Sequence, residues 1–358
     1  MSYHIGIIGG GITALSTAWS LYQQGCQPHI LMKKRLFSAT QAAGGMLSPS
    51  CEVDGCSEEL IELSVKSCAM YPDWIKEIEA LSGLSCEYQS TGTLLIANHH
   101  DHMQELMHLE KFQHKYGLQT QWLTRQEIRE WEPNLTRYVG GLFCPNDHQV
   151  HPRTLYNALY GALKKCNIAF SEYDNLEIGF DGRQVKNLLL NEKPQTFDHY
   201  VICDGTWSKD LLDIPMRPVK GQYVILEGEP LIQRVIRSPN VYMIPRKNQL
   251  FLGATMEEEG FNTQNTAGAI LDLLYHAFQI LPGVYELKMV EQGVGFRPAM
   301  RDNQPLMGHS TFENLWWNTG HYRHGIMLAP AAAALFTEHL LYNSQIPAIF
   351  QSSRFKAH

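Results

Sequence analysis

A short apolar run near the N-terminus leads into three consecutive glycines and then into a helix-forming segment. The run covers residues 5–8, and Gly9, Gly11 and Ala14 complete a G-x-G-x-x-A pattern. In such a pattern the first glycine permits a tight turn, the second lets the backbone approach a pyrophosphate, and the small third residue lets the helix pack against the strand. The phosphates would then face the positive end of the helix. The pattern therefore predicts a dinucleotide-binding unit.

Length and composition limit the classes of protein to consider. The 358 residues are too many for one simple core and favour two domains, or one nucleotide-binding domain with a large insertion. A net charge of -7 argues against a nucleic-acid partner. The first strand begins almost at once and no apolar run reaches membrane-spanning length, so we expect neither a signal peptide nor a membrane partner. The eight cysteines form no C-x-x-C pair, which favours reduced thiols and a cytoplasmic location.

One cluster of histidines invites a metal interpretation. His99, His100 and His102 lie beside Asp101, but nothing near them in the sequence supplies cysteines or spaced carboxylates. A solvated connection between a strand and a helix is the simpler interpretation. We therefore expect no metal site.

Hydrophobic periodicity predicts α/β segments interleaved with antiparallel strands. The runs at 28–32 and 199–203 resemble buried parallel strands, and 219–227 and 241–255 alternate as half-exposed strands do. Further strand character is expected from 84 to 95 and at 140–143. Helices are expected at 58–81, 102–116, 152–165 and 325–341.

Several separated motifs, taken in order, resemble the D-amino-acid oxidase family of flavoproteins, in particular its branch that oxidises glycine for thiamine thiazole biosynthesis. The resemblance covers nearly the whole chain, and its C-terminal motifs are the most diagnostic. The motifs are the segments 8–12, 42–47, 205–208, 219–222, 242–246, 253–256, 295–298 with Asp302 and Pro305, and 320–330.

The resemblance implies a Rossmann-like FAD-binding domain of the glutathione-reductase type interleaved with an antiparallel-sheet substrate domain. The FAD-binding domain would comprise residues 1–82, 144–213 and 296–358. The substrate domain would comprise residues 83–143 and 214–295. FAD would bind non-covalently, and a homo-oligomer is left open.

The resemblance also implies four catalytic residues. Arg297 would grip the substrate carboxylate with its planar guanidinium, a task that suits arginine better than lysine. Tyr242 would donate its phenolic O–H to the same carboxylate. Met256 would help to wall a small pocket, and Arg323 would lie between flavin and substrate. The alternatives are a surface or interdomain salt bridge for Arg297, an ordinary half-buried strand residue for Tyr242 and a core residue for Met256.

The expected cofactor contacts come from six places along the chain. Residues 43–46 would lie against the flavin ring, and 325–328 would begin a last helix whose positive end faces the flavin pyrimidine. The residues expected to bind the cofactor are Gly9, Gly11, Ile12, Thr13, Lys33, Lys34, Ala39, Thr40, Gly44, Gly45, Met46, Asn175, Asp204, Gly205, Trp207, His321, Tyr322, Arg323, His324, Gly325, Ile326 and Met327.

Two positions depart from the family pattern. The second strand normally ends in an acidic residue that binds the adenosine ribose, whereas Lys33 and Lys34 follow it here. Lysine has no acceptor for a ribose hydroxyl. Asp204 stands where a small or neutral residue is usual, and either supplies that carboxylate, pairs with Lys33 or is simply solvated.

The resulting hypothesis is an FAD-dependent oxidase of glycine or a similarly small amino acid, with oxygen as the second substrate. The product imine would hydrolyse to a 2-oxo acid and ammonia, and oxygen would become hydrogen peroxide. A sarcosine or D-amino-acid oxidase or dehydrogenase on the same scaffold is the alternative. An NADP-dependent dehydrogenase, which Lys33 would suit, and a non-catalytic relative without flavin are less favoured.

Overall fold

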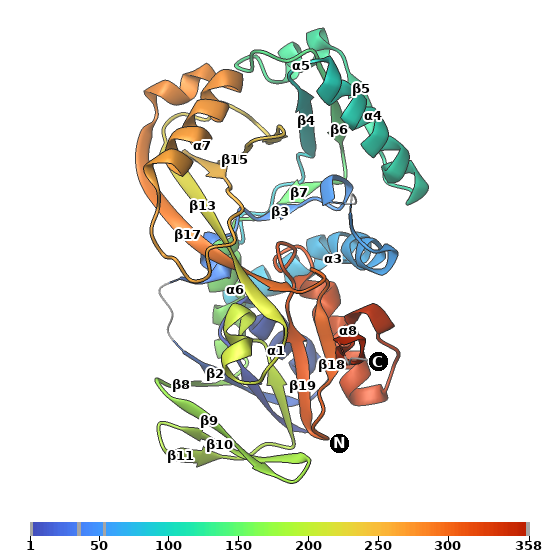
Figure 1. The fold of residues 1–358 in the computed structure, drawn as a ribbon, viewed down its shortest axis with the longest axis vertical. Helices are drawn as coiled ribbons and strands as arrows, with labels where there is room; N and C mark the ends of the chain where they lie inside the picture. The colour runs from blue at the N-terminus through green and yellow to red at the C-terminus, as the bar shows by residue number, and fades with distance from the viewer. Residues whose placement is uncertain (1–2, 34–36, 53–54, 356–358) are drawn as a thin grey trace.

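The computed structural model describes residues 3–33, 37–52 and 55–355 of the chain. One part is a six-stranded sheet at the lower half of the molecule in Figure 1. Its strands are parallel except for β18, which runs antiparallel to β19. In spatial order they are β18 (Leu306–His309), β19 (Leu315–Thr319), β12 (His199–Ile202), β1 (His4–Ile8), β2 (Gln27–Met32) and β8 (Ala169–Glu172).

Four long helices pack around this sheet and against one another. Buried apolar residues such as Ile5, Leu15, Leu159 and Phe336 join the sheet and the helices into one core. In α6, Leu155, Leu159 and Leu163 recur at helical spacing and are all buried, which is why this segment forms a helix. The helices are α1 (Ile12–Gln23), α3 (Glu58–Ser82), α6 (Pro152–Lys165) and α8 (Ala329–Tyr342).

The other part, the upper half in Figure 1, is built on an eight-stranded, mostly antiparallel sheet. Helix α7 (Ala267–Ile280) packs against β13, while α4 (His100–Lys115) and α5 (Arg125–Trp131) contact β4 and β6 respectively. In spatial order the strands are β17 (Lys288–Met300), β13 (Met216–Glu227), β16 (Gln249–Gly253), β15 (Tyr242–Arg246), β14 (Val235–Arg237), β4 (Thr93–Ala97), β6 (Gly140–Cys144) and β5 (Gln121–Leu123).

Smaller elements complete the described chain. β3 (Met46–Leu47) pairs with β7 (His148–Gln149), and β9 (Leu176–Asp181), β10 (Gln184–Leu190) and β11 (Lys193–Gln195) form a separate antiparallel sheet. The short helices are α2 (Ala39–Ala42), η1 (Ser50–Glu52), η2 (Gly205–Asp210), η3 (Pro282–Glu286), η4 (Ala348–Phe350) and η5 (Ser352–Phe355). No described helix combines the length and apolar character that crossing a membrane requires.

The α/β fold class with interleaved antiparallel strands is confirmed. The six-stranded sheet takes its strands from 1–82, 144–213 and 296–358, but β17 of the other sheet runs through the boundary expected at 295. The assignment of these segments to two domains stays a prediction. The expected strand character of 84–95 was wrong for most of that segment, because β4 begins only at Thr93.

A polar contact also joins elements of the two sheets. Arg153 of α6 forms an ion pair with Glu291 of β17, and its Nε donates to the backbone oxygen of Gln41 at 2.9 Å. Tyr223 of β13 donates its hydroxyl to Glu291 at 2.7 Å. These bonds tie the segment before residue 43 to the eight-stranded sheet.

Candidate active site

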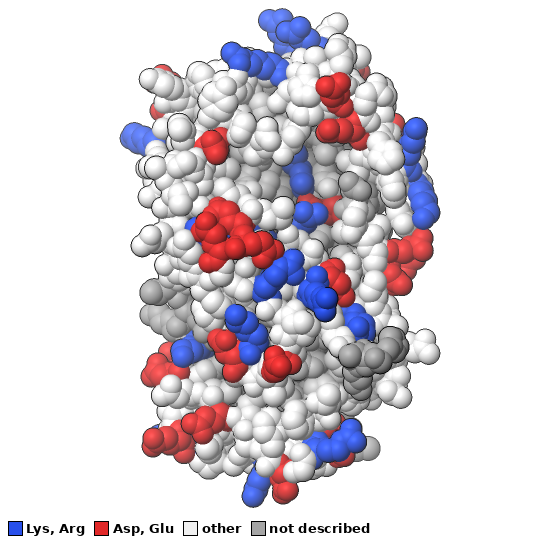
Figure 2. Space-filling model, viewed as in Figure 1, with Lys and Arg blue, Asp and Glu red and all other residues white. Residues whose placement is uncertain are grey.

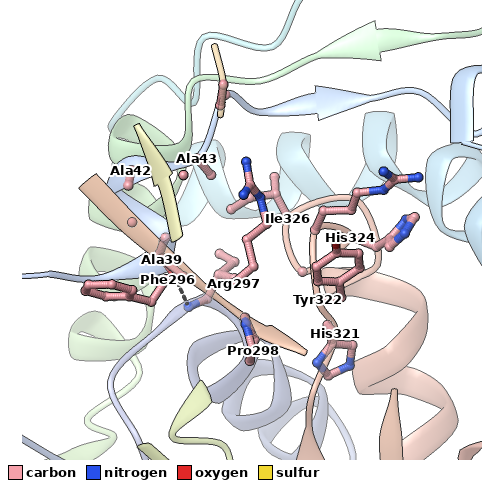
Figure 3. A pocket seen from close by; sticks show the side chains of 18 of the residues that line it. Ala39, Ala42, Ala43, Phe296, Arg297, Pro298, His321, Tyr322, His324 and Ile326 are labelled. Atoms are coloured by element: carbon pink, nitrogen blue, oxygen red, sulfur yellow. Dashed lines mark hydrogen bonds between the residues drawn. The ribbon is translucent and has the colours of Figure 1, made fainter. Parts of the chain in front are cut away.

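A cavity of about 540 Å³ lies where residues of both sheets meet. One end is lined by Gly11 and Thr13 at the start of α1, and the other by Tyr242 and Arg297 of the eight-stranded sheet. On the face drawn in Figure 2 the surface is hollowed, with basic side chains inside the hollow. The close view in Figure 3 has Arg297 rising from its strand between Ala39, Ala42 and the loop that carries Tyr322 and His324.

The glycine turn has the backbone that a pyrophosphate site needs. Gly9 has a φ of +134°, and a Cβ there would lie 2.5 Å from the Cys203 carbonyl oxygen. Gly11 begins α1 as an N-cap without a side-chain cap, and Ile12 N–H is bonded to Thr40 Oγ1 at 3.0 Å. Gly9 itself is outside the cavity wall, whereas Gly11, Ile12 and Thr13 line it. The turn therefore fits a dinucleotide phosphate at the helix N-terminus.

The loop 43–46, which is expected to face the flavin, is fixed by contacts with Val150 and Arg246. Gly45 has a φ of +87°, and a Cβ there would come within 2.0 Å of the Val150 carbonyl oxygen. Buried Arg246 donates to the carbonyl oxygen of Gly44 at 2.7 Å and to that of Ala43 at 3.3 Å. Burial lowers the pKa of Arg246 to about 10, so it stays charged at neutral pH. The loop is thus preorganised as a flat wall of the cavity.

Most of the remaining expected cofactor residues lie on the same cavity. Lys33, Asp204, Gly205 and Trp207 line it, which leaves lysine at the position where the family has an acid. Asn175 does not line the cavity. It is exposed on the turn before β9, where its backbone N–H donates a hydrogen bond to Asn191 Oδ1 at 3.1 Å. Lys34 lies outside the described residues. The other lining residues expected from the sequence are Ala39, Thr40, Gly44, Gly45, Met46, His321, Tyr322, Arg323, His324, Gly325, Ile326 and Met327.

Arg297 and Tyr242 lie together at the substrate end. Arg297 Nη1 donates to the carbonyl oxygens of Lys220 at 3.3 Å and Thr255 at 3.1 Å. A Cβ on Gly221 would lie 2.6 Å from Arg297 Nη2, so a side chain there would displace the guanidinium from its present position. Burial raises the pKa of Tyr242, which Arg297 partly opposes. The phenol therefore stays protonated and can donate a hydrogen bond.

Arg323 has a partner that the sequence did not predict. Its Nε lies 2.6 Å from Glu52 Oε2, and Arg237 Nη1 lies 2.7 Å from Glu52 Oε1. Burial alone would raise the pKa of Glu52, but Arg237 and Arg323 together lower it to about 2. Met256 lines the cavity with its side chain 67% exposed and accepts a contact from the Tyr322 hydroxyl at 3.0 Å. It is therefore at the mouth of the cavity.

The loop 321–328 precedes the last helix rather than beginning it. Helix α8 starts at Ala329, with Pro330 in its first turn, where the missing N–H of proline costs nothing. The expectation that 325–328 form the first helical turn was wrong. Tyr71 donates to the Ile326 carbonyl oxygen and Ser67 to that of Met327 at 2.6 Å, so α3 fixes this loop from behind.

Two buried histidines on this loop are neutral at physiological pH. Burial lowers the pKa of both His321 and His324 to about 4. The positive charge at this end of the cavity therefore comes from the arginines, and Glu52 balances one of them.

The sequence did not predict a role for Glu52 or Arg237, because neither residue belongs to a recognisable motif. Glu52 follows the 42–47 motif by five positions, and its place in that loop was the only signal available. Arg237 ends β14 and meets Glu52 only in the folded chain. Gly221 belongs to the motif 219–222, but the motif by itself does not indicate that this glycine lies beneath Arg297.

The chain is similar to known proteins along nearly its whole length. The chain is 32% identical to the bifunctional protein ThiO/ThiG of Trichormus variabilis over 99% of its own length and 56% of that protein. It thus spans about half the length of such relatives. It is also 29% identical to the glycine oxidase of Geobacillus kaustophilus, over 94% of this chain and 92% of that protein.

Solved structures and a family model complete the comparison. The glycine oxidase structures of Bacillus cereus (TM-score 0.87, 28% identity, 96% of both chains) and Geobacillus kaustophilus (TM-score 0.89, 26% identity, 99% and 100%) share the fold. A family model described as FAD dependent oxidoreductase matches residues 4–339. The chain belongs to this family, the DAO family of FAD-dependent oxidoreductases.

Proposed function

We propose that this protein oxidises the amine of glycine or a similarly small amino acid at the cavity between its two sheets. The observation that carries the proposal is Arg297, held over Gly221 by two backbone carbonyls with Tyr242 beside it. A planar cation beside a phenol donor is suited to a substrate carboxylate. Relatives named glycine oxidase and ThiO support this substrate class and a role in thiamine biosynthesis.

The fit of the cavity to FAD rests on its backbone. FAD, when bound, supplies the acceptor for the two electrons removed from the amine. The N-terminus of α1 would hold its pyrophosphate, and the loop 43–46 would lie along its ring system. Arg323 also lines the cavity, where it would lie between the ring system and the substrate.

The chain's own residues bind and orient the substrate rather than remove its proton. Arg297 and Tyr242 would fix the carboxylate. The acidic residues among those lining the described cavity are Glu52 and Asp204, and Glu52 is held ionised with a pKa of about 2. Such a weak base cannot deprotonate an ammonium group. The substrate amine must therefore become neutral by losing its proton to solvent, which predicts a rate that rises with pH.

The balanced reaction converts glycine, oxygen and water to glyoxylate, ammonia and hydrogen peroxide. One C–H bond of the α-carbon and one N–H bond of the amine are lost to give the imine, which water hydrolyses, and the two electrons and two protons removed convert oxygen to hydrogen peroxide. We propose sarcosine and D-alanine as the competing substrates, and a cytoplasmic location for the enzyme.

Oxygen uptake by the purified, FAD-loaded protein tests the proposal. Glycine, sarcosine and D-alanine should each be compared at equal concentration, with peroxide and the 2-oxo acid measured in parallel. Equimolar oxygen loss and peroxide formation is the expected result. Turnover with a dye but not with oxygen would identify a dehydrogenase, and amino-acid-dependent reduction of NAD or NADP would refute the proposal.

A further inference from the structure

Three side chains that can ligate a metal meet behind the cavity. They are Cys51 in η1, Cys144 at the end of β6 and Asp147 in the turn before β7. One ligand atom from each lies within 4.8 Å of the other two. Three separate segments bring these atoms together, so the cluster is a product of the tertiary fold.

The Asp147 carboxylate is buried beside Ser50 and Cys51, which supply its nearby donors. The residue is fully buried, and Oδ1 accepts a hydrogen bond from the Ser50 N–H at 3.1 Å. Oδ2 is buried without a well-formed hydrogen bond in the part of the chain that the structure describes. A buried carboxylate oxygen without a well-formed hydrogen bond is costly, and a cation at this position would remove that cost.

A buried side-chain amide lies beside one of the two thiols. The side chain of Gln113 is fully buried, and its Nε2 donates to the Ser50 carbonyl oxygen at 3.0 Å and lies 3.8 Å from Cys144 Sγ. An N–H directed at sulfur is the kind of outer contact that orients a metal-bound thiolate. Two thiolates and one carboxylate carry three negative charges, so a divalent cation leaves one. Arg237, which acts electrostatically on both Cys51 and Asp147, faces that remaining charge.

We propose that Cys51, Cys144 and Asp147 bind one thiophilic divalent cation of the zinc class. Zinc accepts sulfur and carboxylate oxygen together in a tetrahedral arrangement, with the fourth position taken by water. Binding replaces the two S–H bonds by two metal–sulfur bonds and releases two protons. The ordinary sequence signal of a zinc site, closely spaced cysteines, is absent, which is why the sequence predicted no metal.

The site would stabilise the substrate end of the cavity. Cys51 directly precedes Glu52, whose carboxylate holds both Arg237 and Arg323. A metal that fixes Cys51 to Cys144 and Asp147 therefore fixes the position of that carboxylate. The binding itself does not depend on which amino acid the enzyme oxidises.

Zinc titration of the FAD-loaded protein, reduced and freed of metal with a chelator, tests the proposal. We expect about one zinc per chain by elemental analysis, and X-ray absorption should give zinc–sulfur distances of about 2.3 Å with a shorter oxygen shell. Cys144→Ser and Asp147→Asn should each weaken zinc binding at least about tenfold. Cys86→Ser, which changes a buried cysteine outside the cluster, should leave it unchanged.

Two results would overturn the inference. One is the absence of stoichiometric zinc in reduced protein that retains FAD and a cooperative thermal transition. The other is a zinc coordination shell without sulfur, since the metal would then be elsewhere. The measurement on the unmodified protein decides the matter even if Cys144→Ser fails to fold.

Discussion

The two ends of the cavity differ in the residues that determine their shape. At the cofactor end the shape depends on absent side chains, because a Cβ on Gly9 or Gly45 would strike a backbone oxygen. At the substrate end it depends on charged side chains, with Glu52 between two arginines and Arg297 held by carbonyl oxygens. Substitutions should therefore act by steric exclusion at the first end and by loss of charge pairing at the second.

The largest expected effect is at the substrate end. Arg297→Ala should reduce kcat/KM for glycine by about 2–5 kcal/mol in transition-state free energy, because the bound carboxylate loses the guanidinium that pairs with it. A carboxylate-free amine should lose almost nothing. Steady-state oxygen uptake gives kcat/KM for glycine and for the carboxylate-free amine, and the ratio of the two values in Arg297→Ala and in the unmodified protein measures the effect.

Tyr242→Phe serves as the graded control for Arg297→Ala. It removes one hydrogen bond and keeps the ring, so the loss on glycine should be only about 0.5–1.5 kcal/mol. Equal losses on glycine and the neutral amine in Arg297→Ala would assign that arginine to the fold rather than to the substrate.

Acid should destabilise the protein through the buried histidines of the substrate end. Their pKa is about 4 when folded and about 6.5 when unfolded. As pH falls below 6.5 the unfolded chain takes up protons that the folded chain does not, so stability falls until about pH 4. Between pH 7 and 5 each histidine should cost about 2 kcal/mol. Chemical denaturation with saturating FAD at both pH values measures the difference. The same loss in a His321→Gln, His324→Gln double variant would show that other groups are responsible.

A matched pair of glycine substitutions tests the cofactor end. Gly45→Ala should destabilise the protein by about 3 kcal/mol and release FAD, because the new Cβ meets the Val150 carbonyl oxygen. Gly25 has a similar φ of +79° but open space around it, so Gly25→Ala should cost only about 1 kcal/mol. Thermal unfolding and bound flavin absorbance would rank the two. Similar losses would mean that backbone conformation, not close approach, makes Gly45 necessary.

The last expected effect is a gain rather than a loss, and it concerns Lys33, one of the charged departures at the cofactor end. Lys33→Glu should strengthen FAD binding by about 1.5–3 kcal/mol, because a carboxylate can accept hydrogen bonds from the ribose. Flavin fluorescence titration of apoprotein gives the dissociation constant. Lys186→Glu, an exposed position on β10, controls for the change in net charge. An unchanged constant would mean that another group, such as Asp204, already binds the ribose.

The same contrast separates what could be predicted from what could not. The glycine turn, α1 and the next strand lie within about thirty residues of one another, so the sequence pattern alone predicts them. The bounds of α6 were predicted to the residue, since Pro152 starts it and its leucines recur on one face. The start of α8 was missed because its neighbour α3, and not local propensity, holds residues 326 and 327.

The sequence by itself determined the dinucleotide fold, the family and the candidate carboxylate-binding residues, because each rests on local backbone requirements or on motifs in a shared order. Only the tertiary structure decided that Glu52 lies between Arg237 and Arg323 and that Asn175 lies away from the cavity. It likewise decided that Cys51 meets Cys144 and Asp147. The physical reason is that charge pairs and ligand clusters depend on distances between remote segments, and those distances are set by how the two sheets pack.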